Sequence, residues 1–232
     1  MSIIGSGNVA TVLDKRIRLA GHSVSQVNSR RGLDTLDKTA DLYILAVSDS
    51  ALYEFPLRLE DKLVVHTAGS VSKEVLKNIS SNYGVLYPLQ SLRKELEPVA
   101  AIPLLIDANN DVNKQVLKTF AQTISAQVGE ADDTERMKLH VAAVIVSNFT
   151  NHLYALAEDY CNKEGLDFGL LYPLINETAQ RIQLHSPVQL QTGPAARRDK
   201  VTIDKHVMLL QTHPALQQLY RQLTESILCK SV

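Results

Sequence analysis

The sequence predicts an α/β fold in which a doubly wound, mostly parallel sheet is followed by an all-α C-terminal domain. Three observations lead to this prediction. Short apolar runs alternate with helical patterns in the first half of the 232-residue chain, and no convincing strand pattern follows about residue 130. A glycine-rich segment at residues 5–10 also lies directly between the first apolar run and the first helical pattern, where such folds turn from strand to helix.

The expected strands are short apolar runs that recur through the first half of the chain. They lie at residues 2–4, 22–28, 41–47, 62–67, 83–89 and 102–108. The central runs are apolar without alternation, which is typical of parallel strands that are covered on both faces. Between them, residues 8–21 and 72–82 carry apolar side chains at helical spacing, so we expect helices there.

The second half of the chain has a helical pattern throughout. Asp132 and Glu135 suit the start of a helix, and the pattern that follows runs to about Lys163. Further helices are expected between residues 168 and 228. We therefore predict two domains without a flexible linker, at residues 1–130 and 131–232.

Composition excludes several classes of function. Lys and Arg number 24 against 25 Asp and Glu, so nothing indicates a surface for nucleic acid or for an anionic membrane. Cys161 and Cys229 have no metal-ligand spacing, which argues against a zinc site or a disulfide framework. No signal peptide pattern opens the chain, and the longest apolar stretch, residues 141–146, is too short to span a membrane. We expect a cytoplasmic protein without a metal.

The segment at residues 5–10 matches G-x-G-x-x-G/A, the pattern of dinucleotide-binding sites. The first glycine permits a tight turn, the second lets the backbone approach a diphosphate, and the final alanine allows close packing of helix on strand. The diphosphate would lie at the helix N-terminus. The predicted cofactor-binding residues are Gly5, Ser6, Gly7, Asn8, Val9 and Ala10 of a Rossmann-type fold. The alternative is a glycine-rich turn in such a fold that has lost its ligand.

The end of the second predicted strand distinguishes NADP from NAD. Enzymes that use NAD tend to place Asp or Glu there to hold the ribose 2′-hydroxyl. This chain has Ser29, Arg30 and Arg31 instead, and no acid before Asp34. A hydroxyl and two guanidinium groups suit a 2′-phosphate, so we predict NADP as the cofactor. The alternative is that the two arginines form a solvated pair in a loop.

The ends of the third and fourth predicted strands should also border the cofactor, because ligands bind at the carboxyl ends of parallel strands. Small side chains there would let a nicotinamide ring lie against the backbone. The residues concerned are Val47, Ser48, Asp49, Ala68, Gly69 and Ser70. For the two serines and the aspartate, helix capping is an equally open interpretation.

Several motifs carry a resemblance to a known superfamily. They are IGSGNVA (4–10), ILAVSD (44–49), HTAGS (66–70), YPLQSL (87–92), NFTNHL (148–153) and QTGPAARRD (191–199). On these motifs the sequence resembles the 6-phosphogluconate-dehydrogenase-like superfamily, near pyrroline-5-carboxylate reductase and deazaflavin-dependent NADP reductases. Within it, the sequence is similar to Rossmann-type NADP oxidoreductases with a helical domain of unknown function. The resemblance implies NADPH binding and a homodimer formed through the helical domain, and it supplies no substrate.

The resemblance does not carry over a mechanism. The β-hydroxyacid dehydrogenase branch pairs a Lys with an Asn one turn later on the long helix, and here Val144 stands where that Lys would be. The predicted catalytic residues are therefore His140 and Asn148. His140 is the candidate acid, because an imidazole can donate a proton near neutral pH.

Four further residues are candidates for contact with the substrate. Asn151 shares a polar stripe of the long helix with His140, and Gln90 follows the fifth predicted strand. Thr192 and Arg197 belong to a Gly-Pro turn, in which an arginine could hold a carboxylate or phosphate. The alternative for this turn is a helix start.

These residues together predict that the protein is an NADP(H)-dependent oxidoreductase. It would transfer a hydride to or from a small polar substrate with a C=O or C=N group. A non-catalytic NADP-binding sensor or regulatory protein is the alternative, because the lysine of the related enzymes is missing. A structural relic of the fold that acts through its helical dimer face is a third interpretation.

Overall fold

The computed structural model describes residues 1–96 and 101–230, which form two compact units. The first unit is Met1–Asn148 and the second is Phe149–Val232. The last strand ends at Glu130, close to where the sequence predicts the change from mixed to purely helical structure. The domain boundary expected there stays a prediction.

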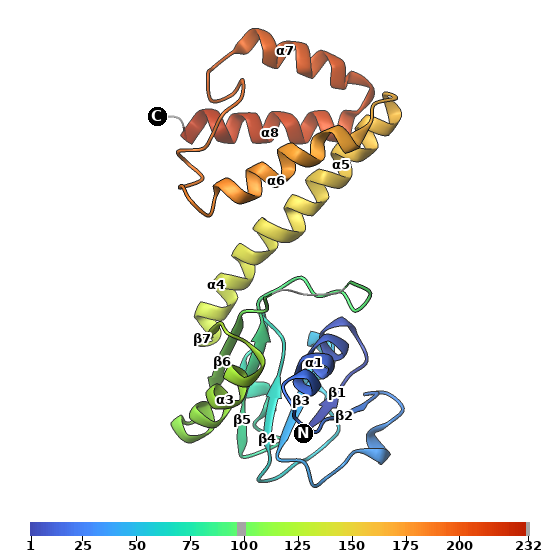
Figure 1. The fold of residues 1–232 in the computed structure, drawn as a ribbon, viewed down its shortest axis with the longest axis vertical. Coiled ribbons are helices and arrows are strands. Elements are labelled where there is room, and N and C mark those ends of the chain that lie inside the picture. Colours follow the sequence, from blue (N-terminus) through green and yellow to red (C-terminus); the bar gives the residue numbers. More distant parts are fainter. Residues whose placement is uncertain (97–100, 231–232) are drawn as a thin grey trace. The chain divides into compact units, whose positions relative to one another are not determined.

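The first unit is built on a seven-stranded sheet (Figure 1). Its order is β2-β1-β3-β4-β5-β6-β7, and all neighbours are parallel except the antiparallel pair β5–β6. The predicted doubly wound, mostly parallel sheet is thereby confirmed. The strands are β1 (Ser2–Ile4), β2 (Ser25–Val27), β3 (Leu42–Leu45), β4 (Leu63–His66), β5 (Asn82–Pro88), β6 (Leu104–Ala108) and β7 (Val128–Glu130).

Alternate residues of the central strands enter hydrophobic clusters on opposite faces of the sheet. In β3, Leu42 and Ile44 pack with α1 (Asn8–Leu19) and α3 (Asp111–Ile124) on one face. Tyr43 and Leu45 pack on the other face, which is covered by short elements. Burial on both faces explains why these strands are apolar without alternation. The short elements are η1 (Leu33–Thr35), α2 (Asp49–Tyr53) and η2 (Lys73–Leu76).

Residues 72–82 depart from the sequence-based prediction. They form the four-residue 3-10 helix η2, turns and the first residue of β5, so the expected helix is wrong. The Ser80 side chain that follows forms hydrogen bonds with the backbone on both sides of it instead of continuing a helix, as serine often does. Ser80 donates to the carbonyl of Lys62 at 2.5 Å and accepts from the N–H of Asn82 at 3.0 Å.

The register of the parallel strands aligns four carboxyl ends at one edge of the sheet. Ile4 pairs with Val27 on one side and Leu45 on the other, and Leu45 pairs with His66. The strand order reverses at β1, which has β2 and β3 as its two neighbours. Such a switch point is where ligands bind in open α/β sheets.

A long helical run begins directly after the sheet. The helix α4 (Asp133–Ala143) starts with a capping box between Asp132 and Glu135. It continues into the π-helical segment η3 (Val144–Phe149) and then α5 (Thr150–Lys163), so the predicted end near Lys163 is confirmed. The division between the two units falls inside η3.

Every element of regular secondary structure in the described part of the second unit is a helix, as predicted, and residues 182–199 form turns and irregular structure. After α5 come η4 (Phe168–Leu171), α6 (Tyr172–Arg181), α7 (Lys200–Leu209), η5 (Leu210–Thr212) and α8 (Pro214–Lys230). Asp199 caps α7 by accepting from the N–H of Thr202 at 3.1 Å, so the turn at residues 191–199 does lead into a helix start. None of the described helices has both the length and the apolar character that crossing a membrane requires.

Candidate functional site

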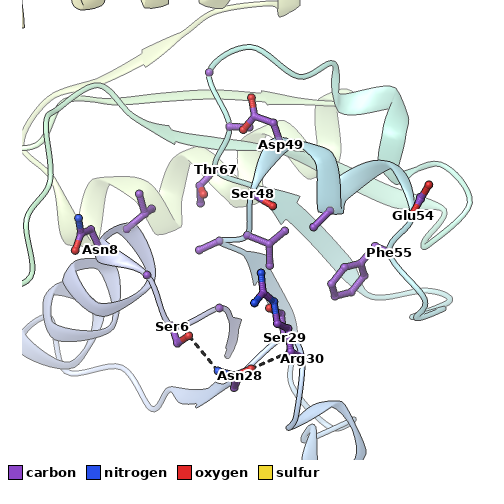
Figure 2. Close-up of a pocket in the computed structure, with 18 of the residues that line it drawn as sticks. Ser6, Asn8, Asn28, Ser29, Arg30, Ser48, Asp49, Glu54, Phe55 and Thr67 are labelled. Carbon is purple, nitrogen blue, oxygen red and sulfur yellow. Dashed lines mark hydrogen bonds between the residues drawn. The ribbon is translucent and has the colours of Figure 1, made fainter. Parts of the chain in front are cut away.

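A cavity of about 710 Å³ opens where the strands β1 to β4 end (Figure 2). We call it the first cavity. Its lining contains every cofactor-binding residue predicted from the sequence except Ala10 and Arg31. Ala10 is fully buried, in keeping with its expected role in packing helix on strand, and Arg31 is exposed. The lining residues that the sequence did not indicate are Asn28, Ala46, Ala51, Glu54, Phe55, Pro56 and Thr67.

Two features of the glycine motif would let the backbone approach a diphosphate. Gly5 has φ +147°, and a Cβ there would lie 2.1 Å from the carbonyl oxygen of Ala46, so no other residue can occupy the position without displacement. Gly7 caps α1 without a side-chain hydrogen bond, and a Cβ on it would meet no atom within 4 Å. The first N–H groups of α1 therefore face open space at the positive end of the helix, which suits an anion.

Asn28 connects the glycine motif to the end of β2. Its Nδ2 donates to Ser6 Oγ at 3.1 Å, and its Oδ1 accepts from the N–H of Arg30 at 2.9 Å (Figure 2). Ser29 and Arg30 follow on the wall of the first cavity. An amide thus occupies the place where an acid would bind a ribose 2′-hydroxyl.

The ends of β3 and β4 form another wall of the first cavity. Ser70 donates a hydrogen bond to Asp49 and so joins the two loops. Ser48 occupies the N-cap position of α2 and makes no capping bond with its side chain. Glu54 and Phe55 also line the cavity, although no motif marks them in the sequence.

His140 lies between the first cavity and a second one. The second cavity has a volume of about 460 Å³ and lies beside the end of β5. The predicted residues Gln90, His140 and Asn148 line it, and the other lining residues are Tyr87, Leu89, Ser91, Leu139, Ala142, Ala143, Val144, Val146 and Ser147. The remaining candidates, Asn151, Thr192 and Arg197, belong to the second unit and are exposed there.

Tyr87 is a site residue that the sequence did not single out. Its hydroxyl is 2.9 Å from His140 Nδ1, and burial raises the pKa of this hydroxyl. Gly69 makes room for the pair, because a Cβ there would lie 2.7 Å from His140 Nδ1 and 2.9 Å from Tyr87 Cζ.

Two buried basic side chains lie near this site. His66 is completely buried, and its Nδ1 accepts from the N–H of Ala68 at 3.2 Å. Arg136 is 1% exposed and donates through Nη2 to Asp133 and to the carbonyl of Val71. His66 Nε2 and Arg136 Nε and Nη1 have no hydrogen-bond partner among the described residues.

Comparison with known proteins identifies the family. Residues 102–227, more than half of the chain, match the model of a domain of unknown function, DUF2520. A proposed NADP oxidoreductase from Bacteroides fragilis is 36% identical over 99% of this chain and 97% of that one, with a TM-score of 0.90. The chain belongs to the DUF2520 family. No curated protein has a matching sequence.

Other solved structures share the fold of this DUF2520 protein at low sequence identity. A reductive aminase from Aspergillus terreus, in complex with NADPH and ethyl levulinate, has a TM-score of 0.65 at 13% identity, covering 97% of this chain and 93% of that one. Pyrroline-5-carboxylate reductase from Streptococcus pyogenes has a TM-score of 0.62 at 12% identity, covering 98% and 97%. The predicted Rossmann-type fold is confirmed, and so is the expected similarity to proposed NADP oxidoreductases with a domain of unknown function.

The burial of His66 predicts a titration that weakens the fold in acid. Burial, followed by the nearby charge of Arg136, lowers its pKa from 6.5 to about 4, against the opposing effects of the Ser72 backbone, Asp133 and Asp49. Between these values the unfolded chain binds a proton that the folded chain does not, so stability is complete above about pH 6.5 and is lost as the pH falls toward 4. The decrease in the free energy of unfolding reaches about 3 kcal/mol at most.

Two measurements check this titration. The ring resonances of His66 should show a midpoint near pH 4. Urea unfolding between pH 4.5 and 7 should show a smaller loss of stability in acid for His66→Asn than for the wild type. The exposed His185→Asn serves as the control and should behave as wild type. A His66 midpoint near 6.5 would contradict the prediction.

Proposed function

We propose that this DUF2520 protein is an NADP(H)-dependent oxidoreductase that transfers a hydride to or from the C=O or C=N group of a small substrate. The observation that carries the proposal is the first cavity, which has an open helix N-terminus, an arginine and a histidine in its lining. The relative from Bacteroides fragilis is named as a proposed NADP oxidoreductase, and the aminase of the same fold was solved in complex with NADPH. Both names support a nicotinamide cofactor.

The lining residues fit the parts of NADP in turn. The open N-terminus of α1 beyond Gly7 would hold the diphosphate, and Ser29 with Arg30 would hold the 2′-phosphate. The loops after β3 and β4 would border the nicotinamide, which supplies or accepts the hydride when it is bound. His140 lines the first cavity together with these loops and would face the substrate side.

The choice of NADP over NAD predicts unequal effects of an arginine substitution. Arg30→Ala should weaken NADPH binding about tenfold or more and change NADH binding less than threefold, because the charge-assisted bond to the 2′-phosphate exists only for NADPH. Fluorescence titration of the two reduced cofactors measures both affinities. Arg31→Ala is the matched control, since this neighbouring arginine does not line the cavity. Equal losses for NADPH and NADH would contradict the assignment.

A non-catalytic sensor or regulatory protein is the second candidate function. It is favoured by Val144, which stands in place of the superfamily lysine and lines the second cavity. Like the first candidate, it requires NADP binding, so binding alone does not separate the two.

Turnover separates the two candidate functions. We expect the protein to oxidise NADPH with at least one member of a panel of ketones, keto acids, imines and a deazaflavin. The loss of absorbance at 340 nm measures this oxidation. A matched reaction without a panel compound gives the background rate. A rise in melting temperature with NADP, together with background oxidation across the whole panel, would support the sensor instead.

We also propose that two copies associate through the helical unit. Many large apolar side chains of that unit are more than half exposed, beyond what a monomer commonly leaves in water. They include Leu166, Leu170, Tyr172, Leu174, Ile182, Leu184, Val188, Val201, Met208 and Leu209.

Acidic substitutions on this unit test the association. The double variant Leu170→Glu, Leu174→Glu should shift the mass in light scattering from twice the chain mass toward 25.7 kDa, because two carboxylates per copy would have to be desolvated. Leu19→Glu is the matched control, because Leu19 is 85% exposed and belongs to α1 of the first unit. A monomeric wild type would overturn the proposal.

A further inference from the structure

The second cavity is apolar and contains few groups that could hold a charge. Half of its described lining residues are leucine, valine or alanine, and Gln90, Ser147 and Asn148 are among its polar groups. Among the residues that the structure describes, the ionisable ones in its lining are Tyr87 and His140, and none is a lysine or arginine. A carboxylate or phosphate against this wall would lose part of its hydration without a described lysine or arginine to pair with. The lining therefore fits a molecule with an uncharged, mainly apolar body.

The hydrogen-bonded pair of Tyr87 and His140 lies where the two cavities adjoin. His140 lines both cavities, and Tyr87 lines the second one. Gly69, on the loop after β4, lies so close that a Cβ would reach both rings. The same loop borders the place proposed above for the nicotinamide. The pair therefore borders both proposed ligand sites.

The surroundings of Tyr87 keep its hydroxyl protonated at neutral pH. Burial is the main effect and raises the pKa of the phenol, with Asp49 acting in the same direction and Arg136 in the opposite one. A phenol that keeps its proton can give it to a stronger base that forms beside it. The hydrogen bond to His140 Nδ1 fixes where the hydroxyl lies.

We infer that Tyr87 is the proton donor of the reaction, that His140 positions its hydroxyl, and that the substrate is a ketone or imine with an uncharged, mainly apolar body seated in the second cavity. This inference rests on the proposed NADP(H)-dependent function. It differs from the sequence-based expectation by placing the donor on β5 rather than on the long helix. It also assigns the substrate an apolar body.

In the direction of reduction, the substrate gains one hydride and one proton. The carbon of C=O or C=N would receive a hydride, which a bound dihydronicotinamide would supply, and the electron pair of the double bond would move to the oxygen or nitrogen. That atom takes the proton from the Tyr87 O–H, so a new O–H or N–H bond forms and Tyr87 becomes a phenolate. The phenolate regains a proton from water or from His140, and no further oxidant or reductant is needed.

Two Tyr→Phe variants on the same strand test the donor. Tyr87→Phe should reduce cyclohexanone at least about 100-fold more slowly than wild type, while NADPH affinity stays within twofold. Tyr83→Phe is the matched control, because Tyr83 lies on β5 outside both cavities and donates to Glu74. Circular dichroism checks that both variants fold. A Tyr87→Phe rate within threefold of wild type would overturn the assignment.

Binding without turnover gives an independent measurement. Calorimetry of the NADP-saturated protein should show that cyclohexanol binds. The substitution Tyr87→Phe should lower the affinity for cyclohexanol about fivefold, because one hydrogen bond is lost. Ala143→Phe, which would fill the second cavity, should abolish cyclohexanol binding and leave NADP binding unchanged. Tighter binding of cyclohexanecarboxylate than of cyclohexanol would overturn the substrate class.

Two substitutions of His140 distinguish a role in positioning the Tyr87 hydroxyl from a general structural role. His140→Asn keeps a hydrogen-bonding atom near the place of Nδ1, whereas His140→Leu does not. The asparagine variant should retain at least about tenfold more activity with cyclohexanone than the leucine variant at equal NADPH affinity. Equal rates for the two variants would overturn the positioning role. A wild type that binds no NADPH would overturn the proposed function together with this inference, whereas normal NADPH binding with an unaltered Tyr87→Phe would overturn this inference alone.

Discussion

The close approach of Gly5 to Ala46 sets the geometry on which the rest of the site depends. The N–H of Gly5 donates to the carbonyl of Val27 at 2.9 Å, while a side chain on Gly5 would collide with the carbonyl of Ala46. One residue is thus held between the strands on both sides of β1. Because the register aligns the ends of these strands, fixing Gly5 also fixes the loops after β2 and β3. Much of the first cavity is therefore shaped by backbone, whose position does not depend on side-chain rotamers.

Buried polar groups close to the cavity are costly to the fold. Arg136 leaves Nε and Nη1 without a hydrogen-bond partner among the described residues, and an unsatisfied buried donor costs about 1–3 kcal/mol. An apolar residue at this position would avoid that cost. The charge of Arg136 acts on His66 and on Tyr87, and it lowers the pKa of both. Arg136 therefore affects the charge of the site while its unpaired donors weaken the fold.

Sequence patterns predicted the fold and most of the first cavity because both depend on near neighbours in the chain. The glycine motif is complete within six residues, and the covered strands are visible as apolar runs. The strand β7 was missed because it has only three residues, none of them buried. Tyr87 was missed because a tyrosine in an apolar strand resembles a core residue, and its partner His140 lies 53 positions later. Such a contact is created by tertiary folding and leaves no local signal.

The valine at position 144, where related enzymes have a lysine, and the Tyr87–His140 pair both determine which charges border the second cavity. A lysine at the position of Val144 would bring a cation to the lining of the second cavity and would favour substrates with an acidic group. With valine there, the lining described for the cavity has no lysine or arginine, and the proposed reaction would use a donor that carries no charge before it reacts. A protonated phenol would meet this requirement, because it gives up a proton without bringing a permanent charge into a mainly apolar space. In the proposed mechanism, the valine at position 144 and the tyrosine at the end of β5 would therefore set the proton donor and the accepted substrates together.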